Sequence, residues 1–486
     1  MRIHPVFLVL LLIANISCSQ KKEERNSSYP KPKHLNIVFV IVDDLDFDEV
    51  NFYDNEQFPC NTYDQLHGRS NNAHYDNRKF KMPTLDKLAS EAAVFNRFYT
   101  PSPVCTPSRF TTLTGRYAHQ YVYNTDTAHQ YSKIEFRTYI SPSEDNIAKR
   151  MNALGYQTGY FGKYHNGQNN QNIYLPGNEE PGVRQGYEKE KQNYSKFVNY
   201  LQDSIGFDVA DRLMSENQQM HNVDWIDEGV RQFVDSNYAE PFFMYISLPI
   251  PHGPYRKLKD INTRYTSAGA LVKNPEVPNN IETAKDENGG NNDYAAMATW
   301  LDGSMANLMD KLEEYNLQEN TLIVFTSDHQ SRGKMTVYES ARVPTFFWYP
   351  SQIEAQTRNE LGTFLDFAPT FASFGGGTST TSDRGLDLTP LLTKGESPER
   401  THLFLECSRF RGVVTEDYKY IERPFDTNDT RFRYENSEQF PHYEERYQLY
   451  NLLDDFSEQE NLIDRGEYRI IQDSLSKLLL NFYLEP

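Results

Sequence analysis

Cysteine is scarce in this chain: four occur among 486 residues, at positions 18, 60, 105 and 407. Cys60 and Cys407 could pair in an oxidising compartment, but two cysteines so far apart in the sequence do not establish a disulfide. With so few cysteines, one that opens a recognisable motif is informative, and Cys105 does so.

Positive charge is also in short supply. The chain has 49 lysines and arginines against 68 aspartates and glutamates, which gives a formal net charge of −19. This balance argues against nucleic acid as a partner. It also means that an anionic substrate must be captured by a local cluster of positive groups.

Long apolar runs are missing except at the N-terminus. There, Arg2 precedes an apolar stretch over residues 6–16 that is too short to cross a membrane as a helix. The stretch predicts a lipoprotein-type export signal at residues 1–17, lipidation of Cys18, and a charged tether over 18–34. The protein would then be a bacterial cell-surface or periplasmic lipoprotein, in contact with the membrane only through that anchor. The alternative is a cleaved signal peptide and a soluble periplasmic enzyme.

The remaining sequence alternates short β-rich runs with helical segments, a pattern typical of an α/β fold with a mostly parallel sheet. Four runs are interpreted as strands, and polar residues follow each of them: 35–42 before Asp43-Asp44, 157–161 before Lys163 and His165, 241–248 before His252, and 321–326 before Asp328-His329. Ligands in open α/β sheets bind beyond the carboxyl ends of the strands. We therefore expect these side chains to meet in one crevice.

Helices are predicted between the strands. One begins near Pro83, a long amphipathic one covers 294–314, and a third begins at a capping box, Ser141-Pro142-Ser143-Glu144, and is closed by Gly155. Three stretches lack periodicity and are predicted to be irregular; those that follow polar strand ends would form pocket walls. They are residues 51–81, 166–195 and 255–292. Further on, 411–421 and 447–453 are interpreted as strands of a smaller antiparallel unit.

Cys105 opens the run Cys105-Thr106-Pro107-Ser108-Arg109. Thr106 is a fair N-cap and Pro107 suits a first helical turn, so the run predicts a helix N-terminus. Such an end stabilises anions through its free N–H groups, and Arg109 adds a positive charge one turn in. The segment is therefore suited to holding an oxyanion. Taken alone, the run favours an ordinary buried cysteine before a helix, and the polar residues that follow the four strands reverse that preference.

The same run matches the Cys-x-Pro-x-Arg signature of the type I sulfatases, and the chain resembles that family over about residues 35–465. The segments Gly333-Lys334-x-Thr336-x-Tyr338-Glu339 and Leu449-Tyr450-Asn451-Leu452 add to the resemblance. It implies an alkaline-phosphatase-like fold: a catalytic domain over 35–385, with a mostly parallel mixed sheet flanked by helices, and a C-terminal unit over 400–486 with an antiparallel sheet and a helix. The layout is similar to iduronate-2-sulfatase and to bacterial polysaccharide sulfatases.

The resemblance also implies a modification and a metal. In the family the motif cysteine, here Cys105, is oxidised to formylglycine (3-oxoalanine) by a formylglycine-generating or anaerobic sulfatase-maturating enzyme. Carboxylates suit hard cations, and they are supplied here by Asp43, Asp44 and Asp328. By resemblance His329 is a further ligand, formylglycine at position 105 contacts the metal, and the ion is one Ca²⁺. Because imidazole is less usual for calcium, ligand type alone leaves manganese and zinc open.

Sulfate ester cleavage needs a nucleophile, stabilisation of charge on the sulfuryl oxygens, and a proton for the leaving alkoxide. By resemblance the hydrated formylglycine attacks sulfur, while Arg109, Lys163 and Lys334 hold the oxygens. His252 is the expected general acid, assisted by Lys334. His165 is expected to take a proton when the sulfated hemiacetal collapses and expels sulfate.

Two residues depart from the usual family sequence. Tyr164 stands where tryptophan is common, which keeps an aromatic ring. Gln330 replaces the glycine that usually follows Asp-His, and this change either alters the local turn or places an amide near the substrate.

The predicted activity is desulfation of a sulfated polysaccharide or oligosaccharide, with algal ulvan or carrageenan first and glycosaminoglycans second, by analogy. One alternative is a phosphoester hydrolase of the same superfamily, although such enzymes usually recruit two metals and ligands for one are found. Another is a surface lipoprotein that binds glycans without catalysis, which would have no need of the catalytic histidines. The sequence does not specify the sugar, the hydroxyl, the exo or endo mode, or the oligomeric state.

Overall fold

The structure is a computed structural model. It describes residues 34–53, 80–121, 134, 138–167, 184–214, 222–252, 264–287, 293–423 and 440–484. Cys18, Cys60 and the expected signal and tether lie outside these residues, as does most of the stretch 51–81. Among the residues described, no helix is both long and apolar enough to cross a membrane.

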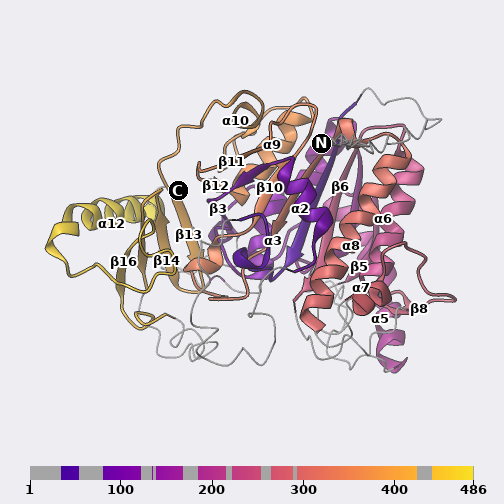
Figure 1. The fold of residues 1–486 in the computed structure, drawn as a ribbon, viewed down its shortest axis with the longest axis horizontal. Helices are drawn as coiled ribbons and strands as arrows, with labels where there is room; N and C mark the ends of the chain where they lie inside the picture. Colours follow the sequence, from indigo (N-terminus) through magenta and orange to yellow (C-terminus); the bar gives the residue numbers. More distant parts are fainter. Residues whose placement is uncertain are drawn as a thin grey trace, which may run out of the picture.

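An eight-stranded sheet forms the centre of the larger part of the molecule, in the order β11-β2-β10-β9-β1-β6-β4-β5 (Figure 1). Its strands are β1 (Asn36–Asp43), β2 (Ala93–Phe95), β4 (Gln157–Lys163), β5 (Val209–Met214), β6 (Phe242–Pro251), β9 (Thr321–Ser327), β10 (Thr345–Trp348) and β11 (Gln356–Arg358). β10 runs antiparallel to β9 and β2, and the other pairs are parallel. The expected α/β fold with a mostly parallel mixed sheet is confirmed.

The four predicted strands are β1, β4, β6 and β9, and they are neighbours in the middle of this sheet. All eight residues of β1 are buried, which explains its unbroken apolar sequence. Its side chains alternate between two cores: Val38, Val40 and Val42 pack on one face, and Ile37, Phe39 and Ile41 on the other. Because the four strands are parallel, their carboxyl ends meet at one edge of the sheet.

Helices cover both faces of the sheet (Figure 1). One face carries α2 (Pro83–Ser90), α6 (Val223–Asn237), α7 (Ile281–Glu287) and α8 (Asp293–Glu314), and the other carries α3 (Cys105–Thr114), α4 (Ile147–Ala153), α5 (Arg184–Asn199), α9 (Phe367–Phe374) and α10 (Thr389–Lys394). Two short ladders pair β3 (Phe98–Tyr99) with β12 (Gly362–Thr363) and β7 (Tyr265–Thr266) with β8 (Gly269–Ala270). Short 3₁₀ segments occupy Phe47–Glu49, Ala118–Gln120, Gln318–Asn320, Glu339–Ala341, Phe364–Asp366 and Gly466–Tyr468, and a π-turn occupies Tyr200–Ile205.

Two local predictions were wrong. The expected capping box at Ser141 is only a turn, and α4 begins three residues after Glu144, with Asn146 as its N-cap. The Asn146 amide accepts from the N–H groups of the first turn and also donates to the Ile205 carbonyl at 3.0 Å, so a distant contact selects this cap. The second error concerns the irregular stretches, because residues 184–199 and 281–287 are helical.

The C-terminal part is a four-stranded antiparallel sheet covered by α12 (Arg469–Leu484). Its strands are β13 (Leu403–Cys407), β14 (Phe410–Val414), β15 (Tyr418–Glu422) and β16 (Tyr447–Asn451). The single strand predicted over 411–421 is two strands, because the Thr415 N–H donates to the Tyr418 carbonyl at 2.8 Å and turns the chain. This sheet lies beside the larger part in Figure 1, at the left of the view.

Candidate active site

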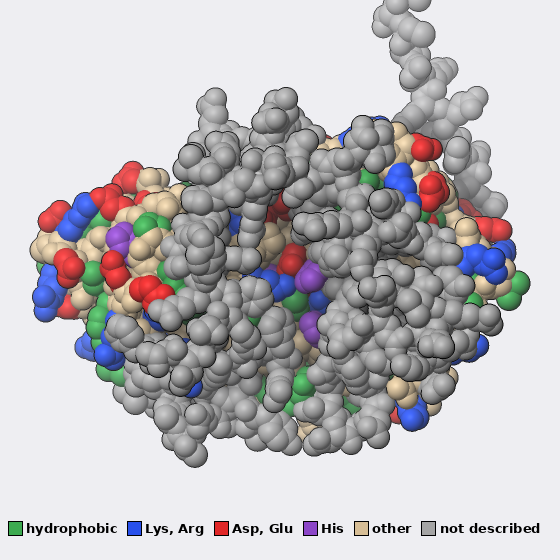
Figure 2. All heavy atoms as spheres, turned by 90° about the horizontal axis from the view of Figure 1, so that it is seen from below, with side chains coloured by type: hydrophobic (Ala, Val, Ile, Leu, Met, Phe, Trp, Pro, Cys, Tyr) green, Lys and Arg blue, Asp and Glu red, His purple; other side chains and the backbone are tan. Residues whose placement is uncertain are grey.

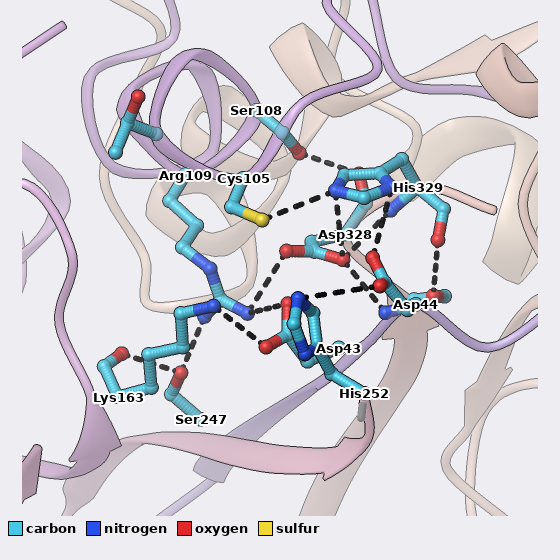
Figure 3. Close-up of polar contacts among 12 residues, drawn as sticks. Asp43, Asp44, Cys105, Ser108, Arg109, Lys163, Ser247, His252, Asp328 and His329 are labelled. Atoms are coloured by element: carbon cyan, nitrogen blue, oxygen red, sulfur yellow. Dashed lines mark hydrogen bonds and ion pairs between the residues drawn. The ribbon is translucent and has the colours of Figure 1, made fainter. Parts of the chain in front are cut away.

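Two neighbouring strands end in acidic residues, and hydrogen bonds join the two strand ends. Asp43 is the last residue of β1, and Asp328 directly follows β9. The Asp328 N–H donates to the Val42 carbonyl at 2.9 Å, and the Asp44 N–H donates to Asp328 Oδ1 at 3.2 Å. Asp44 has φ of +64°, a left-handed conformation that aspartate tolerates better than most residues. The strand ends thus turn three carboxylates toward one point (Figure 3).

Cys105 reaches the same point from a helix N-terminus. It is the first residue of α3, and Val104, not Thr106, is the N-cap. Val104 has extended backbone angles and is buried in the apolar contact with the C-terminal sheet, so tertiary packing overrides the capping preference of threonine. The Cys105 Sγ lies 3.3 Å from His329 Nε2 (Figure 3). Ser108, on the next turn, donates to the Asp328 carbonyl at 2.6 Å.

Four buried residues could hold a metal ion: Asp43, Asp44, Cys105 and His329 offer ligand atoms that all lie within 4.8 Å of one another. Asp328 stands beside them, with Oδ1 3.7 Å from His329 Nε2. Carboxylates gathered this closely in a buried site require positive charge, and a divalent cation would supply it. The residues present therefore fit a divalent metal.

Positive side chains surround the carboxylates. Lys163 Nζ lies 2.6 Å from Asp43 Oδ2, and Lys334 Nζ lies 2.9 Å from Asp44 Oδ1. His252, directly after β6, places Nε2 3.4 Å from Asp44 Oδ2. Residues from four segments, far apart in the sequence, are thereby joined in one network (Figure 3).

Arg109 is fully buried, and its guanidinium contacts protein groups. Its NH2 group lies 3.3 Å from Asp43 Oδ1 and 3.0 Å from Asp328 Oδ2, and its NH1 group donates to Ser247 Oγ at 2.5 Å. These contacts hold the two strand ends together. They give Arg109 a positioning role in the site, and the direct contact with the sulfuryl oxygens expected from the sequence stays a prediction.

The pKa values of the first two aspartates are low. Burial alone would raise the pKa of Asp43, but Lys163, His252 and Arg109 outweigh it and hold that pKa well below its ordinary range. Burial likewise opposes ionisation of Asp44, yet His252 and Lys334 lower its pKa to about 2. Both side chains are therefore carboxylates at neutral pH and ready to bind a cation.

The pKa values of two neighbouring groups, Asp328 and Cys105, are also shifted. Burial, followed by the charge of Asp43, raises the pKa of Asp328 to about 7. Burial would raise the pKa of the Cys105 thiol, but Lys163 and Lys334 lower it to about 6, which is the range of a reactive cysteine.

His165 follows β4 and is partly buried. Burial, followed by the charge of Lys163, holds its pKa well below the ordinary value. It is therefore a neutral imidazole at pH 7, the form that the proton-accepting role expected from the sequence requires.

Seen from below, the described residues bring histidine, acidic and basic side chains together near the middle of the face (Figure 2).

Comparison with known proteins assigns the chain to a family. The profile described as Sulfatase matches residues 35–377, well over half of the chain. The chain belongs to the sulfatase family. A second profile, described as N-sulphoglucosamine sulphohydrolase, C-terminal, matches residues 328–484.

Curated sulfatases and solved structures resemble this chain along most of its length. The ulvan-active sulfatase of Formosa agariphila is 27% identical over 427 residues, which cover 82% of this chain and 75% of that protein. The extracellular sulfatase SULF-1 homolog of Drosophila melanogaster is 26% identical over 407 residues, and the match covers 77% of this chain but 33% of that longer protein.

Two solved structures share the fold. A protein studied for the metabolism of multiple glycosaminoglycans by Bacteroides thetaiotaomicron has a TM-score of 0.63 at 18% identity, over 93% of this chain and 100% of that one. Ps i-CgsB in complex with k-i-k-neocarrahexaose has a TM-score of 0.61 at 21% identity, over 93% of each chain.

Sequence reasoning missed Ser247 in this sulfatase. Ser247 lies on β6, accepts from Arg109 and donates to the Lys163 carbonyl at 2.6 Å, so it joins two residues of the site. The available signal was a single serine inside an otherwise apolar run.

The Gln330 substitution has a structural explanation. Its amide bonds to backbone groups: Oε1 accepts from the Phe47 N–H at 3.0 Å, and Nε2 donates to the Glu339 and Arg342 carbonyls at 2.6 and 2.8 Å. Gln330 fastens the loop after β9 to two other segments.

Proposed function

We propose that this protein is a sulfuric ester hydrolase that removes sulfate from a sulfated polysaccharide or oligosaccharide, using a formylglycine made from Cys105 and one Ca²⁺. The observation that carries the proposal is the position of Cys105. It stands on the first turn of α3, 3.3 Å from His329 and within the buried carboxylate cluster. A hydrated aldehyde there would supply a nucleophilic oxygen in place of sulfur, and the metal would supply positive charge for the sulfuryl oxygens.

The side chains around position 105 divide the remaining work. Asp43, Asp44, Asp328 and His329 would hold the metal. Lys163 and Lys334 reach the same cluster and would share the charge of the sulfuryl oxygens, while Arg109 fixes Asp43 and Asp328. Each of these basic side chains is held by a carboxylate before substrate binds, so the site needs little reorganisation during the reaction.

Two histidines would move protons. His252 is 29% exposed and stands beside Asp44, so it can reach a leaving-group oxygen and protonate it, with Lys334 assisting. His165 is neutral because it is buried, and it can take a proton from the hydroxyl at position 105 in the step that expels sulfate.

The substrate proposal follows the relatives. An ulvan-active sulfatase is among them, and a structural neighbour was solved with a neocarrahexaose, so ulvan and carrageenan are the first substrates to test. Glycosaminoglycans come second, on the Bacteroides neighbour. We further propose export as a lipoprotein through Cys18, maturation by a formylglycine-generating or anaerobic maturating enzyme, and a division into catalytic residues 35–385 and a C-terminal unit over 400–486.

The decisive experiment measures sulfate release by protein co-expressed with a formylglycine-generating enzyme. Ulvan, carrageenan, heparan and chondroitin oligosaccharides would be offered to the wild type, to Cys105→Ala and to Cys407→Ala. Release from one polymer that Cys105→Ala abolishes and Cys407→Ala retains supports the proposal. No release from any of them, with mass spectrometry confirming the aldehyde at position 105, refutes the glycan assignment. Phosphoester hydrolysis that survives Cys105→Ala refutes the reaction.

A further inference from the structure

We infer that the unprocessed chain, which still carries a cysteine at position 105, binds Zn²⁺ through Cys105, His329, Asp43 and Asp44, and that oxidation of Cys105 converts this site into one for a hard cation. Zinc binding by the unprocessed chain is inferred from the contacts among these four residues. The second half rests on the proposed function, because it requires that Cys105 become formylglycine.

The donor set is that of a zinc site. Thiolate and imidazole are preferred zinc ligands, and zinc sites are usually completed to four by carboxylates or water. Calcium instead takes about six to eight oxygen ligands. With sulfur from Cys105 and nitrogen from His329 facing each other, the unprocessed group matches the first pattern and not the second.

The spacing fits a tetrahedral ion. Zinc–sulfur and zinc–nitrogen bonds of about 2.3 Å and 2.0–2.1 Å, at a tetrahedral angle, place the two ligand atoms about 3.5 Å apart. The Cys105 Sγ and His329 Nε2 are 3.3 Å apart. Asp43 and Asp44 offer ligand atoms within 4.8 Å of those of Cys105 and His329, so side-chain adjustment around an ion would bring all four residues to it.

His329 is already oriented as a metal ligand. Its Nδ1 lies 2.9 Å from the Gln330 carbonyl, which can only accept, so Nδ1 carries the proton in this contact. When the ring gives up its second proton to bind a metal, the lone pair lies on Nε2, the atom that faces Cys105. A backbone carbonyl that fixes the outer nitrogen of a ligating histidine is a recurrent feature of zinc sites.

The charge balance also favours a cation. Asp43 and Asp44 are ionised and pair with Lys163 and Lys334, while Asp328 contacts Arg109. Zinc binds the thiolate form of Cys105, which adds a further negative charge to this buried group. A divalent cation would neutralise that charge.

The test uses full-length protein made without any maturation enzyme, with mass spectrometry confirming an unmodified cysteine at position 105. Co²⁺ serves as the spectroscopic probe, and Zn²⁺ is then titrated to displace it. We expect a thiolate-to-cobalt charge-transfer band that Zn²⁺ removes. Cys105→Ser should abolish the band and weaken zinc binding beyond the roughly 10–100-fold that loss of an outer partner costs.

Two further variants control for folding and for the other cysteines. Cys407→Ala alters the other described cysteine, which is buried on β13, and it should keep the band. His329→Asn should weaken Zn²⁺ binding while Ca²⁺ binding persists, because it replaces nitrogen with oxygen. Far-ultraviolet circular dichroism checks that each variant is folded.

A band that persists in folded Cys105→Ser, or zinc affinity that changes less than about tenfold there, overturns the first half. Processed protein that binds Zn²⁺ as tightly as the unprocessed chain overturns the second half. Zinc binding is measured on unprocessed protein and sulfate release on processed protein, so failure of one leaves the other interpretable.

Discussion

At the scale of single residues, the site consists of buried acidic and basic side chains that stabilise one another as ion pairs. Lys163 and Asp43 are both almost completely buried, and their side chains lie 2.6 Å apart. Neither charge would be tolerated there alone, because burying an unpaired ion costs several kcal/mol. The basic side chains of the site are therefore as difficult to replace as its carboxylates.

Lys163→Met should destabilise the metal-free protein by about 3–5 kcal/mol, because it removes the 2.6 Å ion pair of a fully buried carboxylate. Added Ca²⁺ should recover part of this loss by neutralising Asp43. Urea unfolding with a chelator and with Ca²⁺ measures both effects. Lys285→Met is the control: it removes an exposed pair with Glu282 and should cost less than about 1 kcal/mol. Equal losses in the two variants would contradict this account.

At the scale of elements, two strands approach closely just before the site. Gly162, on β4, has φ of +95°, and a Cβ there would lie 1.9 Å from the Ser247 carbonyl oxygen of β6. Only glycine allows this contact, and the next residue is Lys163. The β4–β6 approach therefore sets where that lysine projects.

Gly162→Ala should separate β4 from β6 locally, lower stability and reduce kcat, because the Lys163–Asp43 pair is displaced. Gly155→Ala is a matched control, since Gly155 also has positive φ, +86°, but a Cβ there meets nothing within 4 Å. Kinetics and thermal unfolding of both variants check the prediction. An equal decrease of kcat in the two variants would contradict the prediction.

A second element-scale feature is the polar contact between α6 and α8. Asp227 is buried, accepts from Ser304 and accepts from Asn307 Nδ2 at 2.8 Å. Burial raises its pKa to about 7, although both hydrogen bonds act in the opposite direction. The folded protein therefore holds a proton that the unfolded chain releases near pH 4.

The native state binds this proton more tightly, so its stabilising effect is complete below about pH 4 and is lost as the pH rises through 7. Stability should fall by up to about 4 kcal/mol over that window, and Asp227→Asn should flatten the slope. Urea unfolding at pH 5 and pH 8 measures the difference. An unchanged slope in the variant would show that other groups cause the dependence.

At the scale of the whole molecule, the C-terminal sheet supports the catalytic site. Its apolar face packs against Val104, the residue before Cys105, and Met335, the residue after Lys334. Tyr338 completes the contact: its ring stacks on Phe440 at 4.1 Å, and its hydroxyl donates to Gln448 Oε1 at 2.6 Å. The C-terminal unit thus supports the segments that carry Cys105 and Lys334.

Tyr338→Phe should cost about 1 kcal/mol of stability through the lost hydrogen bond. It should also lower kcat with little change in KM, because Lys334 is less firmly held. Tyr420→Phe removes a similar bond, to Glu422, from the apolar cluster that faces α12, and it should leave kcat unchanged. Steady-state sulfate release compares them, and equal kcat values would show that the C-terminal sheet does not position the lysine.

The sequence alone determined the central strands and the type of chemistry. Runs such as 35–42 are apolar throughout because both faces are buried, and parallel strands deliver the polar residues that follow them to one edge. Asp43 and Asp328 could therefore be placed together, and the resemblance to the sulfatases added Cys105. Only the tertiary structure decided that Val104 and Asn146 cap their helices, that Arg109 serves two carboxylates, and that Lys334 meets Asp44 across the fold. The physical reason is that local patterns record which residues are buried, whereas these contacts join segments far apart in the chain, whose partners are fixed only when the chain packs.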